Sequence, residues 1–408
     1  MMKTNITKMK KSLMTIGIFA MSVCMMAACG NKSANNAADG VAAVEANDDN
    51  SPAMQLLNSV PFTEEGLKSM IKTPEKEALT PEEFEALFLA YSKVNINEKT
   101  QNLENNFVGK VRSEVMRGRK RTESADVILD NLLKNPSPQV RGVAVQQFGG
   151  LYGMTGETAS KLVKALENEQ NAFVLKEGIK TLSNQLKYDD VKKFVLGQID
   201  NPEKEVRKAI ALSVGNFWSR DIDGVKDAAM KLLGDGDEDV RKTILGYVGQ
   251  LADDSFVPEL VKVLNDPNQG KLHGDAMRSL YTMWYDYPQH KNTSKAAYEA
   301  TVKYLKTTPR TKDIPAWQTI GGLQNQNAKD YDAWKAKATY YNNSEFVKLM
   351  MDIAADPNAN WLGRGPAVKV IAKIGTKADL EKVKSLVSAN SDDKDQKNVL
   401  QAIEKELK

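Results

Sequence analysis

The feature that most constrains the fold is an internal repeat, which is clearest between residues 201 and 251. Each half of this stretch opens with an acidic or prolyl turn, passes through a Val-Arg pair, and reaches a glycine nine residues after the valine. The two copies run from Val206-Arg207 to Gly215 and from Val240-Arg241 to Gly249. A unit repeated at this spacing is typical of a stacked helical array, in which neighbouring units bury each other's apolar faces.

The same frame fits at five positions, spaced 34, 32, 34 and 32 residues apart: Val140, Val174, Val206, Val240 and Leu272. Between these anchors lies a second apolar pattern that ends in Asn or Asp. Apolar residues stand three and four positions before the last apolar residue of each copy, which is the spacing of one helix face. Each unit is therefore predicted to be two short helices and a turn, and the chain to be all-α.

The pattern resembles the short HEAT-like repeats that are also seen in phycobilin lyases. The resemblance rests on the Asp/Asn turn, the Val-Arg pair, the glycine, and a small or apolar residue four after the anchor: Ala144, Gly178, Ile210, Ile244 and Ala276. It implies a right-handed α-solenoid of stacked helix pairs. It covers residues 122–283 well and residues 344–408 more loosely, and the HEAT-like repeat array is predicted to span residues 122–287.

In that family the arginine tends to pair with an acidic residue near the turn between repeats, which gives a ladder through the stack. By this resemblance, Arg141, Arg207 and Arg241 are predicted to be structural ladder residues rather than ligand-binding ones. Leu175 and His273 stand at the same place in their repeats, so the ladder is expected to be interrupted there.

Residues 1–28 are predicted to be a signal peptide rather than part of the fold. Four lysines precede an apolar run from Ser12 to Met26, which is too short to span a bilayer. The sequence Met26-Ala27-Ala28-Cys29 resembles a bacterial lipobox, which implies cleavage before Cys29 and a lipid on its sulfur. The alternative is an ordinary signal peptide with an incidental cysteine. Residues 29–55 are small and polar and are predicted to be a disordered tether.

Net charge gives no reason to expect a nucleic-acid partner. The precursor carries 56 basic and 53 acidic residues, a charge of +3. Cleavage before Cys29 removes four lysines and no acids, which leaves 52 basic and 53 acidic residues.

Because of the signal peptide and the lipobox, the protein is expected in the bacterial cell envelope, held to the membrane by its lipid. Gly30-Asn31-Lys32-Ser33 lacks the acidic export signal of some surface lipoproteins, which favours the periplasmic side over the cell surface.

No catalytic residue, metal site or cofactor is predicted. The cysteines are Cys24, within the signal, and Cys29, and the chain has two histidines without metal-ligand spacing. A nucleophile elbow and a glycine-rich phosphate loop are also missing from the sequence. The prediction is therefore that the protein is not an enzyme.

Two patterns are candidate binding surfaces. Two positions before the aligned apolar end of the second helices stand Lys164, Lys231 and Lys262, which could form a stripe that receives an acidic partner. The alternative is a merely solvated face, because exposed lysine is common. Residues 56–121, off the repeat frame, are predicted to be an N-terminal helical cap.

The second pattern is aromatic. Residues 288–343 leave the repeat frame, and most tryptophans and tyrosines fall between 281 and 361. Trp284, Tyr285 and Tyr287 could form a protein- or glycan-binding patch, because such rings dominate interfaces. The alternative is that bulky rings fill the gap where the repeats break phase. The sequence therefore favours a non-catalytic scaffold that binds an envelope protein, with a glycan-binding lipoprotein as the alternative.

Overall fold

The computed structural model describes residues 130–136, 138–152, 154–285, 293–310 and 328–408. All of them belong to one compact unit, Ser51–Lys408. Throughout these ranges the regular secondary structure is helical, and none of it is strand. The predicted signal peptide, tether and cap lie outside the described residues, as do Cys29 and Tyr287.

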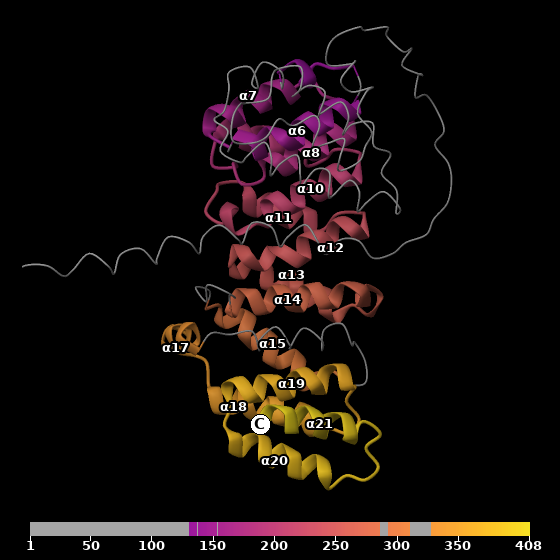
Figure 1. The fold of residues 1–408 in the computed structure, drawn as a ribbon, viewed down its shortest axis with the longest axis vertical. Helices are drawn as coiled ribbons and strands as arrows, with labels where there is room; N and C mark the ends of the chain where they lie inside the picture. Colours follow the sequence, from indigo (N-terminus) through magenta and orange to yellow (C-terminus); the bar gives the residue numbers. More distant parts are fainter. Residues whose placement is uncertain (1–129, 137, 153, 286–292, 311–327) are drawn as a thin grey trace, which may run out of the picture. The chain divides into compact units, whose positions relative to one another are not determined.

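The repeat frame forms helix pairs in chain order (Figure 1). The first helices, which carry the anchors, are α6 (Pro138–Tyr152), α8 (Ala172–Leu182), α10 (Lys204–Val214), α12 (Glu238–Tyr247) and α14 (His273–Trp284). The second helices are α7 (Gly156–Leu166), α9 (Asp189–Gly197), α11 (Val225–Leu233), α13 (Val257–Asn265) and α15 (Lys295–Thr307). Short 3-10 turns fill the connections at η2 (Phe217–Ser219), η3 (Val248–Leu251), η4 (Asp254–Phe256) and η5 (Pro267–Leu272).

Stacking of the first helices holds the array together. α6 packs on α8, α8 on α10, α10 on α12, and α12 on α14. The anchors Val206 and Val240 are fully buried in this row. The predicted all-α solenoid is therefore confirmed, and its core is the apolar seam between successive helix pairs.

The Asp/Asn turns start the helices, as their residue types dictate. Asn171 accepts backbone hydrogen bonds from Phe173 and Val174 at the start of α8. Asp237 does the same at the start of α12. Side-chain oxygens at this position satisfy backbone N–H groups that have no partner inside the helix.

The chain ends in a further set of helices: α17 (Ala328–Lys337), α18 (Asn343–Ala355), α19 (Trp361–Ile374), α20 (Lys377–Ser388) and α21 (Gln396–Leu407). α19 packs on α18 and α21, and α20 packs on α21. α19 begins at Trp361, because the Asn360 side chain caps it by accepting the backbone N–H of Leu362, and Pro366 lies within its early turns. By its contacts, α19 plays the part of a first helix, and α21 is the next one.

Candidate functional site

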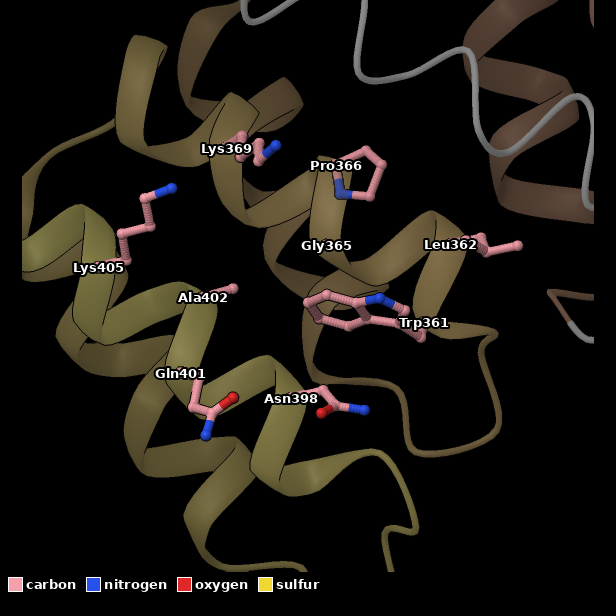
Figure 2. A pocket seen from close by; sticks show the side chains of 9 residues that line it. All are labelled: Trp361, Leu362, Gly365, Pro366, Lys369, Asn398, Gln401, Ala402 and Lys405. Carbon is pink, nitrogen blue, oxygen red and sulfur yellow. The ribbon is translucent and has the colours of Figure 1, made fainter.

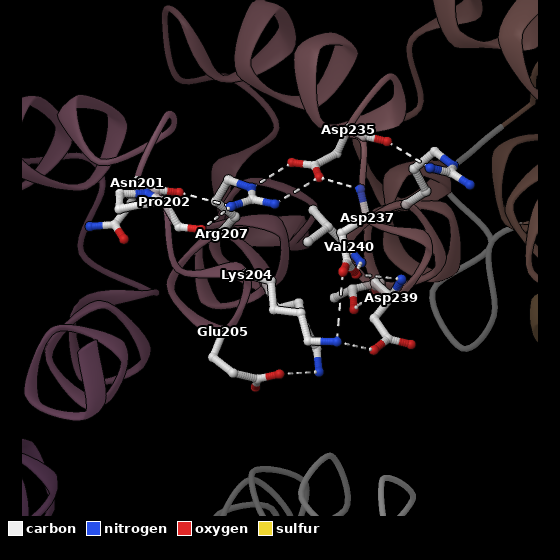
Figure 3. Close-up of polar contacts among 12 residues, drawn as sticks. Asn201, Pro202, Lys204, Glu205, Arg207, Asp235, Asp237, Asp239 and Val240 are labelled. Carbon is white, nitrogen blue, oxygen red and sulfur yellow. Dashed lines mark hydrogen bonds and ion pairs between the residues drawn. The ribbon is translucent and has the colours of Figure 1, made fainter. Parts of the chain in front are cut away.

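The arginines of the repeat frame join successive repeats. Arg207 donates from Nε and Nη2 to the carboxylate of Asp235, 28 residues further on, at 2.7 and 3.1 Å. Its Nη1 donates to the backbone oxygens of Asn201 and Pro202 in the preceding turn. Figure 3 shows this guanidinium between the turns before and after its own helix pair. One side chain therefore fixes two inter-repeat turns.

Asp235 also organises its own turn. Its Oδ1 accepts the backbone N–H of Asp237 at 2.8 Å, and its backbone oxygen accepts Nη1 of Arg241 at 2.7 Å. The hydrogen bonds from Arg207 outweigh burial and lower the pKa of Asp235. The ion pair raises the pKa of Arg207 in turn. Both side chains stay charged at neutral pH, so the link is a charge-assisted one.

Arg141 makes the same contacts two repeats earlier, in the Val140 repeat. It donates to the two carboxylate oxygens of Glu169 at 2.7 and 3.0 Å and to the backbone oxygens of Asn135 and Pro136. Burial works to raise the pKa of Glu169, but the hydrogen bond from Arg141 and those of its own turn lower it overall. Each of these arginine–carboxylate links is one rung of the ladder. The two rungs have the same geometry, so this arrangement belongs to the repeat and not to one site.

The other ladder positions differ in how much of the rung they keep. Arg241 holds the preceding turn through Asp235. His273, which was expected to interrupt the ladder, still contacts the preceding turn, since its Nε2 lies 3.0 Å from the backbone oxygen of Asp266. Leu175 is buried and supplies no polar group.

The most deeply buried of these arginine–carboxylate links was not anticipated from the sequence. Arg364 on α19 donates to both oxygens of Asp393 at 2.8 and 2.6 Å and to the backbone oxygen of Ala354 at 2.9 Å. Its side chain is 0% exposed and that of Asp393 is 1% exposed. The hydrogen bonds from Arg364 lower the pKa of Asp393. Gly363 stands where the anchor valine would be, so the repeat was not recognised from its anchor. The signal that could have identified the pair is the spacing of 29 residues from Arg364 to Asp393.

The predicted lysine stripe lies on exposed positions of α7, α11 and α13. Lys231 pairs with Asp200 at 2.6 Å, and Lys262 lies 3.6 Å from Glu259. Lys164 is exposed and lies near Asp190. The pKa of Asp190 is lowered mainly by a hydrogen bond with the Ser160 side chain and, to a smaller extent, by the charge of Lys164. Lys231 and Lys262 therefore form ion pairs, and Lys164 also has a carboxylate nearby.

The predicted aromatic patch contains rings that are buried. Trp284 is 1% exposed and Tyr285 is 5% exposed. The indole of Trp284 donates to Thr301 on α15 at 3.1 Å, and that of Trp334 donates to the backbone oxygen of Trp284 at 2.8 Å. The structure therefore places Trp284 and Tyr285 in the core, where a ligand cannot reach their faces.

This aromatic cluster crosses the break in repeat phase. Around Trp284 lie rings from α14, α15, α18 and the segment before α18: Tyr281, Tyr298, Tyr341 and Phe346. Large rings fill the irregular space between the two repeat segments, and the two indole N–H groups have acceptors. Trp284 and Tyr285 therefore fit the alternative given for this pattern, that bulky rings fill the gap where the repeats break phase.

Trp218 is an exposed tryptophan that the sequence pattern did not single out. It lies in the 3-10 turn after α10 and is 66% exposed. Its ring meets Phe217 edge-on, and the Arg220 guanidinium lies over the Phe217 ring, 4.8 Å from the ring centre. The signal that could have identified it is its place in a turn, outside every apolar helix face.

No group of three or more His, Cys, Asp or Glu side chains in the described part of the chain could hold a metal ion. Among the helices described, none is both long and apolar enough to cross a membrane.

Comparison with known proteins supports the repeat assignment. Residues 193–280 match a model of HEAT repeats, a stretch that contains the Val206 and Val240 units. Together with the stacked first helices, this match supports a HEAT-like repeat protein. No curated protein matches the chain.

Solved structures with a similar course were also found. The crystal structure of an engineered protein has a TM-score of 0.39 and 15% identity, over 87% of this chain and 98% of that one. The crystal structure of Kap121p bound to Ste12p has a TM-score of 0.47 and 11% identity, over 87% of this chain and 40% of that one.

Proposed function

We propose that this chain is a non-catalytic, lipid-anchored scaffold that binds a protein partner in the bacterial cell envelope. The observation that carries the proposal is the stack of HEAT-like helix pairs, in which charged side chains link the repeats to one another. The outer sides of successive helices are then free to face a partner. Repeat arrays of this kind bind other proteins over extended surfaces built from many repeats.

Cys29 supports the anchor, because it follows Met26-Ala27-Ala28 at the end of the apolar signal. Cys29→Ser should remove the lipid and release the chain from the membrane fraction. Metabolic labelling with a fatty acid, followed by fractionation, measures this directly. Equal membrane retention and equal labelling of the variant would contradict the anchor.

Partner binding is tested by purifying the tagged full chain from its native envelope in mild detergent. We expect one protein to be recovered in a fixed ratio to the chain. Glu substitutions at Lys164, Lys231 and Lys262 should weaken that recovery if the lysine row contacts an acidic partner. Unchanged recovery would remove the row from the binding surface, and a chain recovered alone would contradict the scaffold.

A further inference from the structure

A groove runs between α19 and α21 in the C-terminal repeats (Figure 2). Its volume is about 660 Å³, within the range of roughly 300–1,000 Å³ that is usual for ligand pockets. Half-buried Trp361 and Pro366 line it on α19, and Gln401 and Ala402 line it on α21. Figure 2 shows Lys369 and Lys405 on facing helices at one end of it and Trp361 at the other.

The repeat frame shows what is unusual about these two lysines. Lys180 on α8 and Arg278 on α14 stand five residues after the ladder position of their repeats. Each pairs with an acid three residues earlier: Lys180 with Glu177 at 3.2 Å, and Arg278 with Asp275 at 3.0 Å. In the central array, a basic residue at this place therefore has its own carboxylate.

Lys369 and Lys405 occupy the same place, five residues after Arg364 and Leu400. Three residues before them stand Pro366 and Ala402, so the carboxylate is replaced by an apolar side chain in both helices. Neither lysine forms an ion pair within the described part of the chain. Both substituted residues line the groove, and no Asp or Glu is among its lining residues.

From this geometry we propose that the groove docks an acidic segment of a partner protein. The segment's carboxylates lie against Lys369 and Lys405, and one of its apolar side chains packs between Trp361 and Ala402. The proposal rests on the scaffold function above and specifies the chemistry of the partner. Charge complementarity carries it, because two ammonium groups share one groove without a carboxylate of their own.

The form of the groove favours a peptide over a neutral glycan. It lies between two helices, and the small residues Gly365 and Ala402 are among those that line it. An extended or helical segment fits such a channel. The exposed amides of Asn398 and Gln401 can exchange hydrogen bonds with peptide groups. The paired positive charges have no counterpart in an uncharged sugar.

The test is a binding titration with the full chain and a fluorescein-labelled synthetic peptide of Glu and Leu, read by anisotropy. Matched peptides carry Gln or Lys in place of Glu. Lys369→Glu with Lys405→Glu should weaken binding of the Glu peptide by about tenfold or more and should gain affinity for the Lys peptide. Lys382→Glu with Lys394→Glu is the control, because it changes the charge equally on exposed residues outside the groove.

Equal binding of the Glu and Gln peptides, or equal loss in both double variants, overturns the proposal. Binding of maltohexaose in place of the Glu peptide overturns it in favour of a glycan site. The scaffold function fails separately: if the wild-type chain recovers a stoichiometric protein and the groove variant recovers it equally well, the function stands and the groove assignment falls. If neither recovers a protein, the function itself falls.

Discussion

The central array and the C-terminal repeats use the same arginine rung at different depths. In the central array, the Arg207 side chain is 17% exposed and its partner Asp235 is 9% exposed. In the C-terminal repeats, Arg364 and Asp393 are 0% and 1% exposed. The hydrogen bonds are alike, but water can reach one guanidinium and not the other. The same link between repeats should therefore differ in what its loss does to stability.

The buried rung gives the largest expected effect. Asp393→Ala leaves the Arg364 guanidinium without water or a carboxylate, which should lower the free energy of unfolding by about 3–5 kcal/mol. Urea denaturation followed by circular dichroism measures the loss, and hydrogen exchange in α19 and α21 locates it. Arg364→Met combined with Asp393→Leu should recover most of the stability, because a buried ion pair can be replaced by apolar side chains. A loss no larger than that of Asp235→Ala would contradict the difference in depth.

The glycine of the repeat gives the next effect. A Cβ at Gly249 would lie 2.4 Å from the backbone oxygen of Ser279 on α14, so Gly249→Ala should destabilise by about 1–3 kcal/mol. The C-terminal repeat has Ala372 at this place, and Ala372→Gly should cost only about 0.5–1 kcal/mol. Gly197→Ala is the matched control, because nothing lies within 4 Å of that Cβ. Thermal unfolding measures all three, and equal shifts in melting temperature would show that close approach is not the cause.

The partly exposed link between Arg207 and Asp235 gives the smallest effect and a pH dependence. Asp235→Asn removes the charge that Arg207 faces and should destabilise by about 1–2 kcal/mol at neutral pH. The folded pKa of Asp235 is lowered, so its contribution is fully present above the unfolded value of about 4 and is lost as pH falls through the folded pKa. Unfolding of wild type and variant should therefore converge below that range. A difference that persists undiminished in acid would mean that the carboxylate charge does not stabilise the array.

Local spacing was enough to predict the repeats, and the resemblance to HEAT-like repeats gave Arg141 and Arg207 their expected role between them. Arg141 and Arg207 follow a valine anchor, and the acids that they contact stand at the turns that the pattern marks. Arg364 was not predicted because Gly363 stands in place of the anchor valine, although Asp393 follows at a spacing close to that of the other two pairs. Spacing along the chain indicates which arginine and which acid can pair, but it does not indicate how deeply the pair is buried.

The aromatic residues show where sequence reasoning ends. Trp and Tyr are frequent both in cores and at interfaces, so their type could not decide between the two. Trp284 is buried because Trp334 and Phe346, far along the chain, close around it. The groove likewise depends on α21 packing beside α19, which places Lys405 across from Lys369.

The most direct test of the account is the amount of partner protein recovered with the tagged chain from its native envelope, compared between wild type and the Lys369→Glu, Lys405→Glu variant. The Lys382→Glu, Lys394→Glu variant serves as the control for charge. The account predicts a stoichiometric partner with the wild type and the control, and its loss from the groove variant. Recovery of the wild-type chain without any partner protein would contradict the scaffold function itself.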